Sequence, residues 1–304
     1  MSTMQAAAPS NDTRPSGILG WMKSHPLVAY FTLAYALTWV LIVPIMLSQR
    51  GLGIFNLPDP VLLVFFILAT FSGPLPAAFI MTSIIDGASG RQQLWRRMFQ
   101  WRVGLGWYLL VLVAYPLIFL AGLTFYSGAA PWSALIQKWP LIFSYYLPTA
   151  ALGIIFPSLG EEPGWRGFAL PRLQQQYGPL AGSLILGTLH GLWHLPVYFI
   201  PGSILDGPFD FTQFAANTCL IIALTFIWTW LFNNAGQSVL FAMFVHGTSN
   251  AASGLIPRLV VDTTGDPWFG FKVGAVCALI IIVFTRGRLG YPSPREKRDI
   301  HLSS

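Results

Sequence analysis

Long apolar runs dominate this chain and restrict what it can fold into. Eight stretches of mostly apolar residues reach the length of about 18 residues or more that a membrane-spanning helix needs. They cover approximately residues 27–47, 61–85, 107–126, 140–159, 179–200, 211–232, 238–256 and 268–285. The runs are continuous, whereas the strands of a membrane barrel alternate between apolar and polar residues. The sequence therefore predicts an all-α fold, a polytopic membrane helix bundle of about eight transmembrane helices.

Charged residues are rare and unevenly distributed along the chain. They make up 9% of the sequence, against about 25% in a soluble domain, so most of the surface is expected to face lipid. If the amino terminus is cytoplasmic, thirteen of the seventeen Lys and Arg residues fall in cytoplasmic segments. The positive-inside rule then predicts both termini in the cytoplasm, in a bacterial cytoplasmic membrane. The net charge of +6 fits attraction to the inner leaflet and requires no nucleic acid.

The chain divides into one membrane domain and two polar ends. Residues 1–26 are rich in Ala, Ser and Pro, which predicts a disordered cytoplasmic tail. Residues 27–286 contain no linker and no internal repeat, so they form a single membrane domain, and 287–304 form a basic cytoplasmic tail. The connection Arg91–Trp107 is read either as a short helix in the membrane interface or as a plain basic loop.

Several ionisable or polar residues lie inside or beside the apolar runs. Glu161 and Glu162 are two of only three glutamates in the chain, and Arg166 follows Glu162 by four residues. Two further pairs have the same four-residue spacing, which puts both members on one face of a helix: His190 with His194, and His246 with Asn250. A charged group at membrane depth costs about 2.5–3.5 kcal/mol on insertion scales, so these positions are candidates for function.

This set of side chains can activate water. A carboxylate and an imidazole hold and deprotonate a water molecule, and an imidazole with an amide can stabilise an oxyanion. A second possibility is that Glu161, His194 and His246 bind one zinc ion and leave a position for water. The His-Glu-x-x-His signature of zinc proteases is missing from the sequence, and residue spacing leaves both chemistries open.

The three polar segments together resemble the CAAX prenyl protease 2-like family of intramembrane proteases, which includes bacteriocin-processing and bacteriocin-immunity (Abi) proteins. That family has Glu-Glu-x-x-x-Arg, then aromatic-x-x-x-His, then His-x-x-x-Asn on successive membrane helices. Residues 161–166 match the first motif, His194 ends the second, and His246 and Asn250 match the third. His190 stands where the family usually has Phe or Trp, which predicts a structural residue or a pocket wall. The resemblance covers roughly residues 140–256.

The resemblance implies an endopeptidase that hydrolyses a peptide bond of a membrane-associated protein or peptide. It assigns Glu161 as general base and His194 as the residue that positions the water. Glu162 and Arg166 would orient the site, and His246 and Asn250 would stabilise the oxyanion. Two other functions remain open: a proton- or ion-coupled transporter that relays protons through the same residues, and a non-catalytic protein of the bacteriocin-immunity type.

Overall fold

The computed structural model describes residues 17–202, 207–260 and 265–292. Most of the predicted amino-terminal tail and residues 293–304 of the predicted carboxy-terminal tail lie outside these ranges. Within them the chain is helical, and the extended pairing is limited to one isolated bridge between Ser48 and Phe55. The predicted all-α helix bundle is confirmed.

The helices follow one another with short connections. The first five are α1 (Ile18–Ser24), α2 (Pro26–Leu47), α3 (Asp59–Ser72), α4 (Pro74–Met98) and α5 (Leu105–Ser127). The central segment contains α6 (Ala130–Gln137), a π-helix (Ile142–Tyr146), α7 (Leu147–Ile155), α8 (Ser158–Glu162) and a second π-helix (Pro163–Ala169). The last part contains α9 (Leu170–Trp193), a 3₁₀-helix (Leu195–Phe199), α10 (Phe211–Asn234), α11 (Val239–Leu259) and α12 (Phe269–Phe284).

Six helical runs in the described residues are long and apolar enough to cross a membrane. They are Pro26–Leu47, Asp59–Met98, Leu105–Ser127, Ile142–Phe199, Phe211–Asn234 and Val239–Leu259. The predicted spans 140–159 and 179–200 both overlap the single run Ile142–Phe199, because helix continues through the segment between them. The last predicted span corresponds to α12, which has 16 residues and is shorter than the others.

Apolar side chains on the outside of the bundle support a membrane location. Leu63 and Leu68 on α3 are at least half exposed, as are Val276 and Val283 on α12. Such a large apolar surface is unfavourable in water and favourable in lipid. Helices can present it to lipid because their backbone hydrogen bonds are satisfied internally. The chain is therefore an integral membrane protein.

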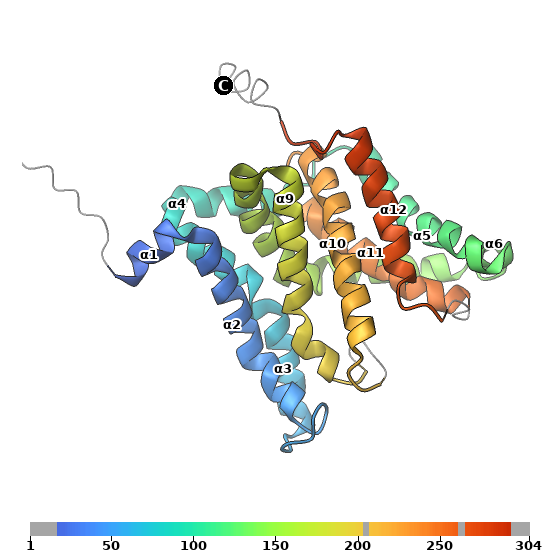
Figure 1. The fold of residues 1–304 in the computed structure, drawn as a ribbon, viewed down its shortest axis with the longest axis horizontal. Coiled ribbons are helices and arrows are strands. Elements are labelled where there is room, and N and C mark those ends of the chain that lie inside the picture. Colours follow the sequence, from blue (N-terminus) through green and yellow to red (C-terminus); the bar gives the residue numbers. More distant parts are fainter. Residues whose placement is uncertain (1–16, 203–206, 261–264, 293–304) are drawn as a thin grey trace, which may run out of the picture.

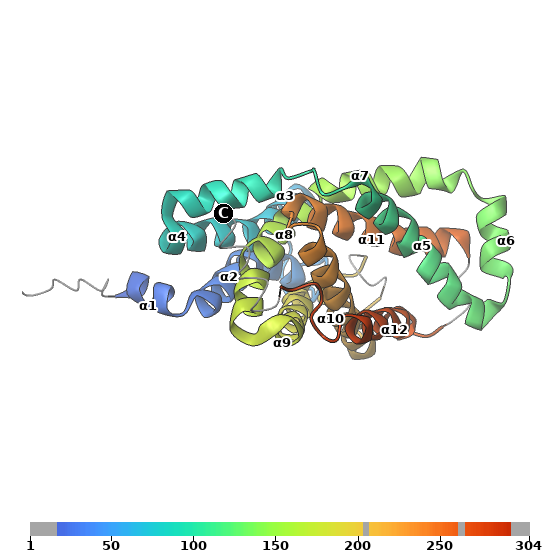
Figure 2. The ribbon, with the colours of Figure 1, turned by 90° about the horizontal axis from the view of Figure 1, so that it is seen from above.

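The two larger of the three buried apolar clusters among the described residues form most of the interior. One joins α2, α4, the second π-helix and α9, and the other joins α5, α7, α10 and α11. Helices α1 and α4 lie at one end of the long axis and α6 lies at the other (Figures 1 and 2). Helix α8 lies near the middle and contacts α3, α4, α7 and α11 (Figure 2). The two glutamates on α8 therefore lie where the two apolar clusters meet.

Helices α7 and α11 approach each other closely through two glycines. A Cβ atom on Gly247 would lie 2.7 Å from the carbonyl carbon of Gly153, and one on Gly153 would lie 2.6 Å from the Cα of Gly247. Only glycine leaves room for backbone contact of this kind, as at other interfaces of membrane helices. The contact brings α11, which carries His246, against the segment that leads into α8.

Two segments differ from the sequence-based expectations. Residues 160–178 were expected to connect two spans on the cytoplasmic side, but they are helical, and every residue from Gly160 to Leu170 is buried. The glutamate pair thus lies within a helical run. Ile18–Ser24 forms helix α1 inside the segment predicted as disordered, and residues 91–98 are the last turns of α4 beyond a kink at Gly87.

Candidate active site

Glu161 and Glu162 begin the site, and a π-helix directly follows them. The run Pro163–Ala169 continues the helix without a break, because proline is compatible with the first turn, where its missing N–H has no partner to lose. A Cβ on Gly164 would overlap Tyr30 and Pro74, so glycine is required there. Short π-helical segments are rare and frequently occur at functional sites. Here the segment is entirely buried.

Glu161 makes two hydrogen bonds through one carboxylate oxygen. Its Oε2 accepts from His190 Nε2 at 2.9 Å and from Trp165 Nε1 at 3.3 Å. Glu161 and His190 are both buried, with 3% exposure each. The other oxygen, Oε1, makes no hydrogen bond within the described residues, and it is not fully enclosed by protein atoms. It is therefore free to accept a proton.

Glu162 is the centre of a second, separate network. Its Oε1 accepts from Arg166 Nη1 at 3.0 Å and from His246 Nδ1 at 2.8 Å. Glu162 and Arg166 are completely buried, and the Arg166 guanidinium lies 4.6 Å from the ring centre of Trp228. A buried carboxylate that accepts from two donors fixes the orientation of both. This network therefore holds the His246 ring and the π-helical segment in place.

His194 and His190 lie on one face at the end of α9, as their spacing predicts. His194 caps the helix and donates a hydrogen bond from Nδ1 to the backbone oxygen of His190 at 3.0 Å. Because Nδ1 is the donor, Nε2 of His194 keeps a free lone pair. The two rings are 5.2 Å apart, and the His190 ring lies 6.4 Å from that of His246. Glu161, Glu162, His190, His194 and His246 thus form one carboxylate–imidazole cluster.

The structure brings together most but not all of the predicted site residues. Asn250 lies one turn beyond His246 on α11, is exposed, and makes no hydrogen bond within the described residues. The predicted zinc ligands Glu161, His194 and His246 are not the set that the structure brings together. Within the described residues, the three groups with ligand atoms all within 4.8 Å of one another are Glu161, His190 and His194. His190, which was predicted to be a structural residue or a pocket wall, thus hydrogen-bonds directly to the carboxylate of Glu161.

Arg97 and Trp228 also support the site, and no sequence pattern pointed to either residue. Arg97 lies near the end of α4 and donates from its guanidinium to the backbone oxygens of Arg166 and Gly167. In the sequence it is one of several basic residues near a predicted cytoplasmic connection. Trp228 on α10 covers Arg166 on one side and lies 5.0 Å from the His246 ring. Both contacts join residues far apart in the chain, so no local pattern predicts them.

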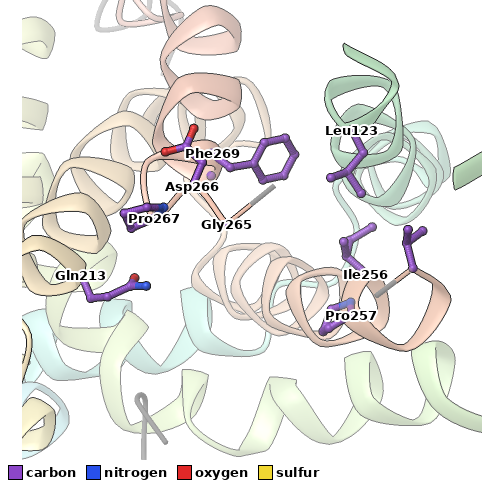
Figure 3. Close-up of a pocket in the computed structure, with 10 residues that line it drawn as sticks. Leu123, Gln213, Ile256, Pro257, Gly265, Asp266, Pro267 and Phe269 are labelled. Atoms are coloured by element: carbon purple, nitrogen blue, oxygen red, sulfur yellow. The ribbon is translucent and has the colours of Figure 1, made fainter. Parts of the chain in front are cut away.

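A cavity of about 460 Å³ lies away from the carboxylate–imidazole cluster (Figure 3). It is formed at the ends of α5 and α11 and the starts of α10 and α12. Its lining residues include Leu123, Gln213, Ile256, Pro257, Asp266 and Phe269. A hydrogen bond from Lys272 holds the pKa of the Asp266 carboxyl group below its usual value. None of the predicted site residues lines this cavity, so it is not a second part of the site.

Comparisons with known proteins point to one family. Residues 142–252 match a family model described as type II CAAX prenyl endopeptidase Rce1-like. The chain is also 25% identical over 183 residues to a CAAX prenyl protease 2 from Methanococcus maripaludis. That match covers 57% of this chain and 66% of the archaeal protein. The matched residues include all three motifs, and the resemblance read from them is confirmed.

Proposed function

We propose that the chain is an intramembrane endopeptidase, because residues 142–252 match the model of the type II CAAX prenyl endopeptidase Rce1-like family. Its substrate is a membrane-associated protein or peptide, and the attacking water is activated by Glu161. The observation that carries this proposal is the buried Glu161 carboxylate, held by His190 and Trp165 through one oxygen while the other has no partner within the described residues. The transporter alternative is not favoured by the family match.

The hydrolysis needs a base, a positioned water and stabilisation of the negative charge that develops on the carbonyl oxygen. Glu161 Oε1 accepts the proton of the attacking water, and His194 holds that water through the free lone pair of Nε2. After attack, the proton on Glu161 passes to the departing amine as the peptide bond breaks. This sequence balances protons and uses one water for each bond cleaved.

The remaining motif residues orient the site and stabilise charge. Glu162 and Arg166 fix the His246 ring through hydrogen bonds of 2.8–3.0 Å. A carboxylate on Nδ1 selects the ring tautomer and favours an imidazolium, as in the Ser-His-Asp arrangement. With a proton on Nε2, His246 can then donate to the oxyanion. Asn250 lies one turn away on α11, where its amide is a second donor when substrate is bound.

The test compares Glu161→Gln with wild type and with the control Asp59→Asn. Both substitutions replace a carboxylate with an amide of the same shape, but Asp59 is exposed and pairs with Arg50 at the far end of α2. Each protein is expressed in the same cells, and new protein termini in the membranes are compared by proteomics. Termini produced by the wild type and Asp59→Asn are expected to vanish with Glu161→Gln.

A cleavage assay with one of these substrates, using purified protein in liposomes, gives the size of the effect. Loss of a general base commonly costs about 10²–10⁴ in rate. An unchanged set of termini, together with Glu161→Gln cleaving at the wild-type rate, would show that Glu161 is not the base and that the proposed function is wrong.

A further inference from the structure

A polar cavity of about 590 Å³ lies between the start of α2, the second half of α4 and the start of α9. That volume falls in the range of about 300–1,000 Å³ typical of small-molecule sites. After the kink at Gly87, α4 turns one helical face toward the cavity. This face consists of Gly90, Gln93, Leu94 and Arg97. None of the predicted site residues lines the cavity, so the proposed cleavage reaction does not use it.

Positive charge exceeds negative charge on the wall of this cavity. Its charged lining residues are Arg97, Arg172 and Asp86. Asp86 pairs with Arg172 at 2.5 Å, whereas no carboxylate within the described residues forms an ion pair with Arg97. The two guanidiniums also repel each other. An anion in the cavity supplies the missing counter-charge for Arg97 and offsets this repulsion.

Both guanidiniums are held in place and still have donors to offer. Arg97 donates to three backbone oxygens at 3.0–3.2 Å. Arg172 donates to the backbone oxygen of Phe168 and to Asp86. These bonds use only part of the N–H groups that each arginine carries. Arginine is well suited to phosphate, because its planar fork of donors matches the spacing of two phosphate oxygens.

Three glutamine amides add neutral donors and acceptors to the cavity. They belong to Gln93, Gln176 and Gln237. The first two are exposed and the third is half-buried. An amide donates to phosphate oxygens through its nitrogen and accepts from hydroxyl groups through its oxygen. The cavity therefore suits a phosphate that carries a hydroxylated group, as in a glycerol headgroup.

Aromatic side chains place the cavity at the surface of the membrane. Trp95 and Phe99 on α4 are exposed and stack with ring centres 5.7 Å apart, and Trp21 on the neighbouring α1 is also exposed. Helices α1 and α4 lie together at one end of the molecule (Figures 1 and 2). Tryptophan is enriched at the level of lipid headgroups. The exposed Arg91 and Arg96 on the same part of α4 add a positive charge that attracts anionic lipid.

We propose that this cavity binds the headgroup of one anionic phospholipid, with Arg97 and Arg172 as the ligands of its phosphate. The site is separate from the proposed cleavage reaction and can be tested without it. Arg97 also donates to the backbone oxygen of Arg166. The bound lipid and the buried segment that carries Arg166 therefore share one guanidinium.

The experiment counts bound lipid by native mass spectrometry, with the full chain purified in detergent. The ligands are phosphatidylglycerol, phosphatidylcholine and inorganic phosphate, each titrated separately. The test variant Gln93→Glu puts a negative charge into the cavity, and the matched control Gln92→Glu puts the same charge at the adjacent position, which does not line the cavity. Both glutamines are exposed on the same helix, so neither variant is expected to disturb the fold.

A second pair of variants removes positive charge. Arg97→Gln is compared with Arg96→Gln, because Arg96 is exposed and lies outside the cavity. We expect the wild type and the two control variants to bind one phosphatidylglycerol per chain, more tightly than phosphatidylcholine. Gln93→Glu and Arg97→Gln should bind phosphatidylglycerol about tenfold more weakly or worse, as for the loss of one hydrogen bond to a charged group.

Three results overturn the proposal. The first is equal affinity of the wild type for phosphatidylglycerol and phosphatidylcholine. The second is equal weakening by Gln93→Glu and Gln92→Glu, which shows general attraction to the surface and no site. The third is binding of inorganic phosphate as tight as that of phosphatidylglycerol and equally sensitive to Gln93→Glu, which assigns the cavity to free phosphate. If Arg97→Gln does not fold, the two glutamine variants decide the question alone.

Discussion

The buried Arg166–Glu162 pair provides the sharpest test of the geometry, through the substitution Arg166→Gln. Both side chains are completely buried, and the pair is joined at 3.0 Å. Removing one partner of a buried pair leaves an uncompensated charge and typically costs about 3–5 kcal/mol. The Arg166 guanidinium also faces Trp228 at 4.6 Å, and a desolvated cation–π contact contributes about 2 kcal/mol. We therefore expect the free energy of unfolding to fall by at least about 3 kcal/mol.

The matched control is Arg50→Gln, which breaks the Arg50–Asp59 pair in the same chain. That pair is joined at 2.8 Å, but its side chains are 59% and 67% exposed. Exposed ion pairs contribute about 0–1 kcal/mol, so this substitution should have little effect. The two Arg→Gln variants differ mainly in the burial of the broken pair, and burial is the quantity under test.

The free energy of unfolding is measured by reversible denaturation with sodium dodecyl sulfate in mixed micelles, followed by the fluorescence of the 12 tryptophans. Equal losses for Arg166→Gln and Arg50→Gln, or a loss below about 1 kcal/mol for the former, would refute the reasoning. The double variant Glu162→Leu with Arg166→Met removes both charges and should recover much of the stability. Its recovery is limited because His246 loses the acceptor for its Nδ1 proton.

Three further predictions concern the helix contact, the oxyanion and the topology. Gly247→Ala should destabilise the protein by about 1–3 kcal/mol, since its Cβ would meet the α7 backbone. The control Gly106→Ala meets nothing within 4 Å and should be neutral or stabilising; equal effects would contradict the close contact. Asn250→Ala should slow cleavage by ~10²-fold or less, and a loss larger than that of Glu161→Gln would assign Asn250 a more central role. With Cys219 and Cys277 replaced by Ala, Gln92→Cys should react with a membrane-impermeant reagent only in opened cells, and Gln137→Cys also in intact cells; the reverse pattern would invert the topology.

The sequence by itself determined the fold class and most members of the site. Apolar runs such as 211–232 specify membrane helices because lipid requires each helix to satisfy its own backbone hydrogen bonds. Four-residue spacing is equally local, and it correctly put Glu162 beside Arg166 and His190 on one face with His194. These predictions succeed because they depend on helical geometry alone.

Only the tertiary structure decided how the members pair. The contacts of Glu161 with His190 and of Glu162 with His246 join residues 29 and 84 positions apart, and no periodicity encodes them. The sequence also placed the glutamates in a connecting segment, residues 160–178, because the apolar run 140–159 ends before them. Close packing of Gly164 against Tyr30 and Pro74, and burial of Trp165 and Phe168, keep that segment helical in the interior. Packing between distant helices, which local propensity does not contain, therefore determines the geometry of the site.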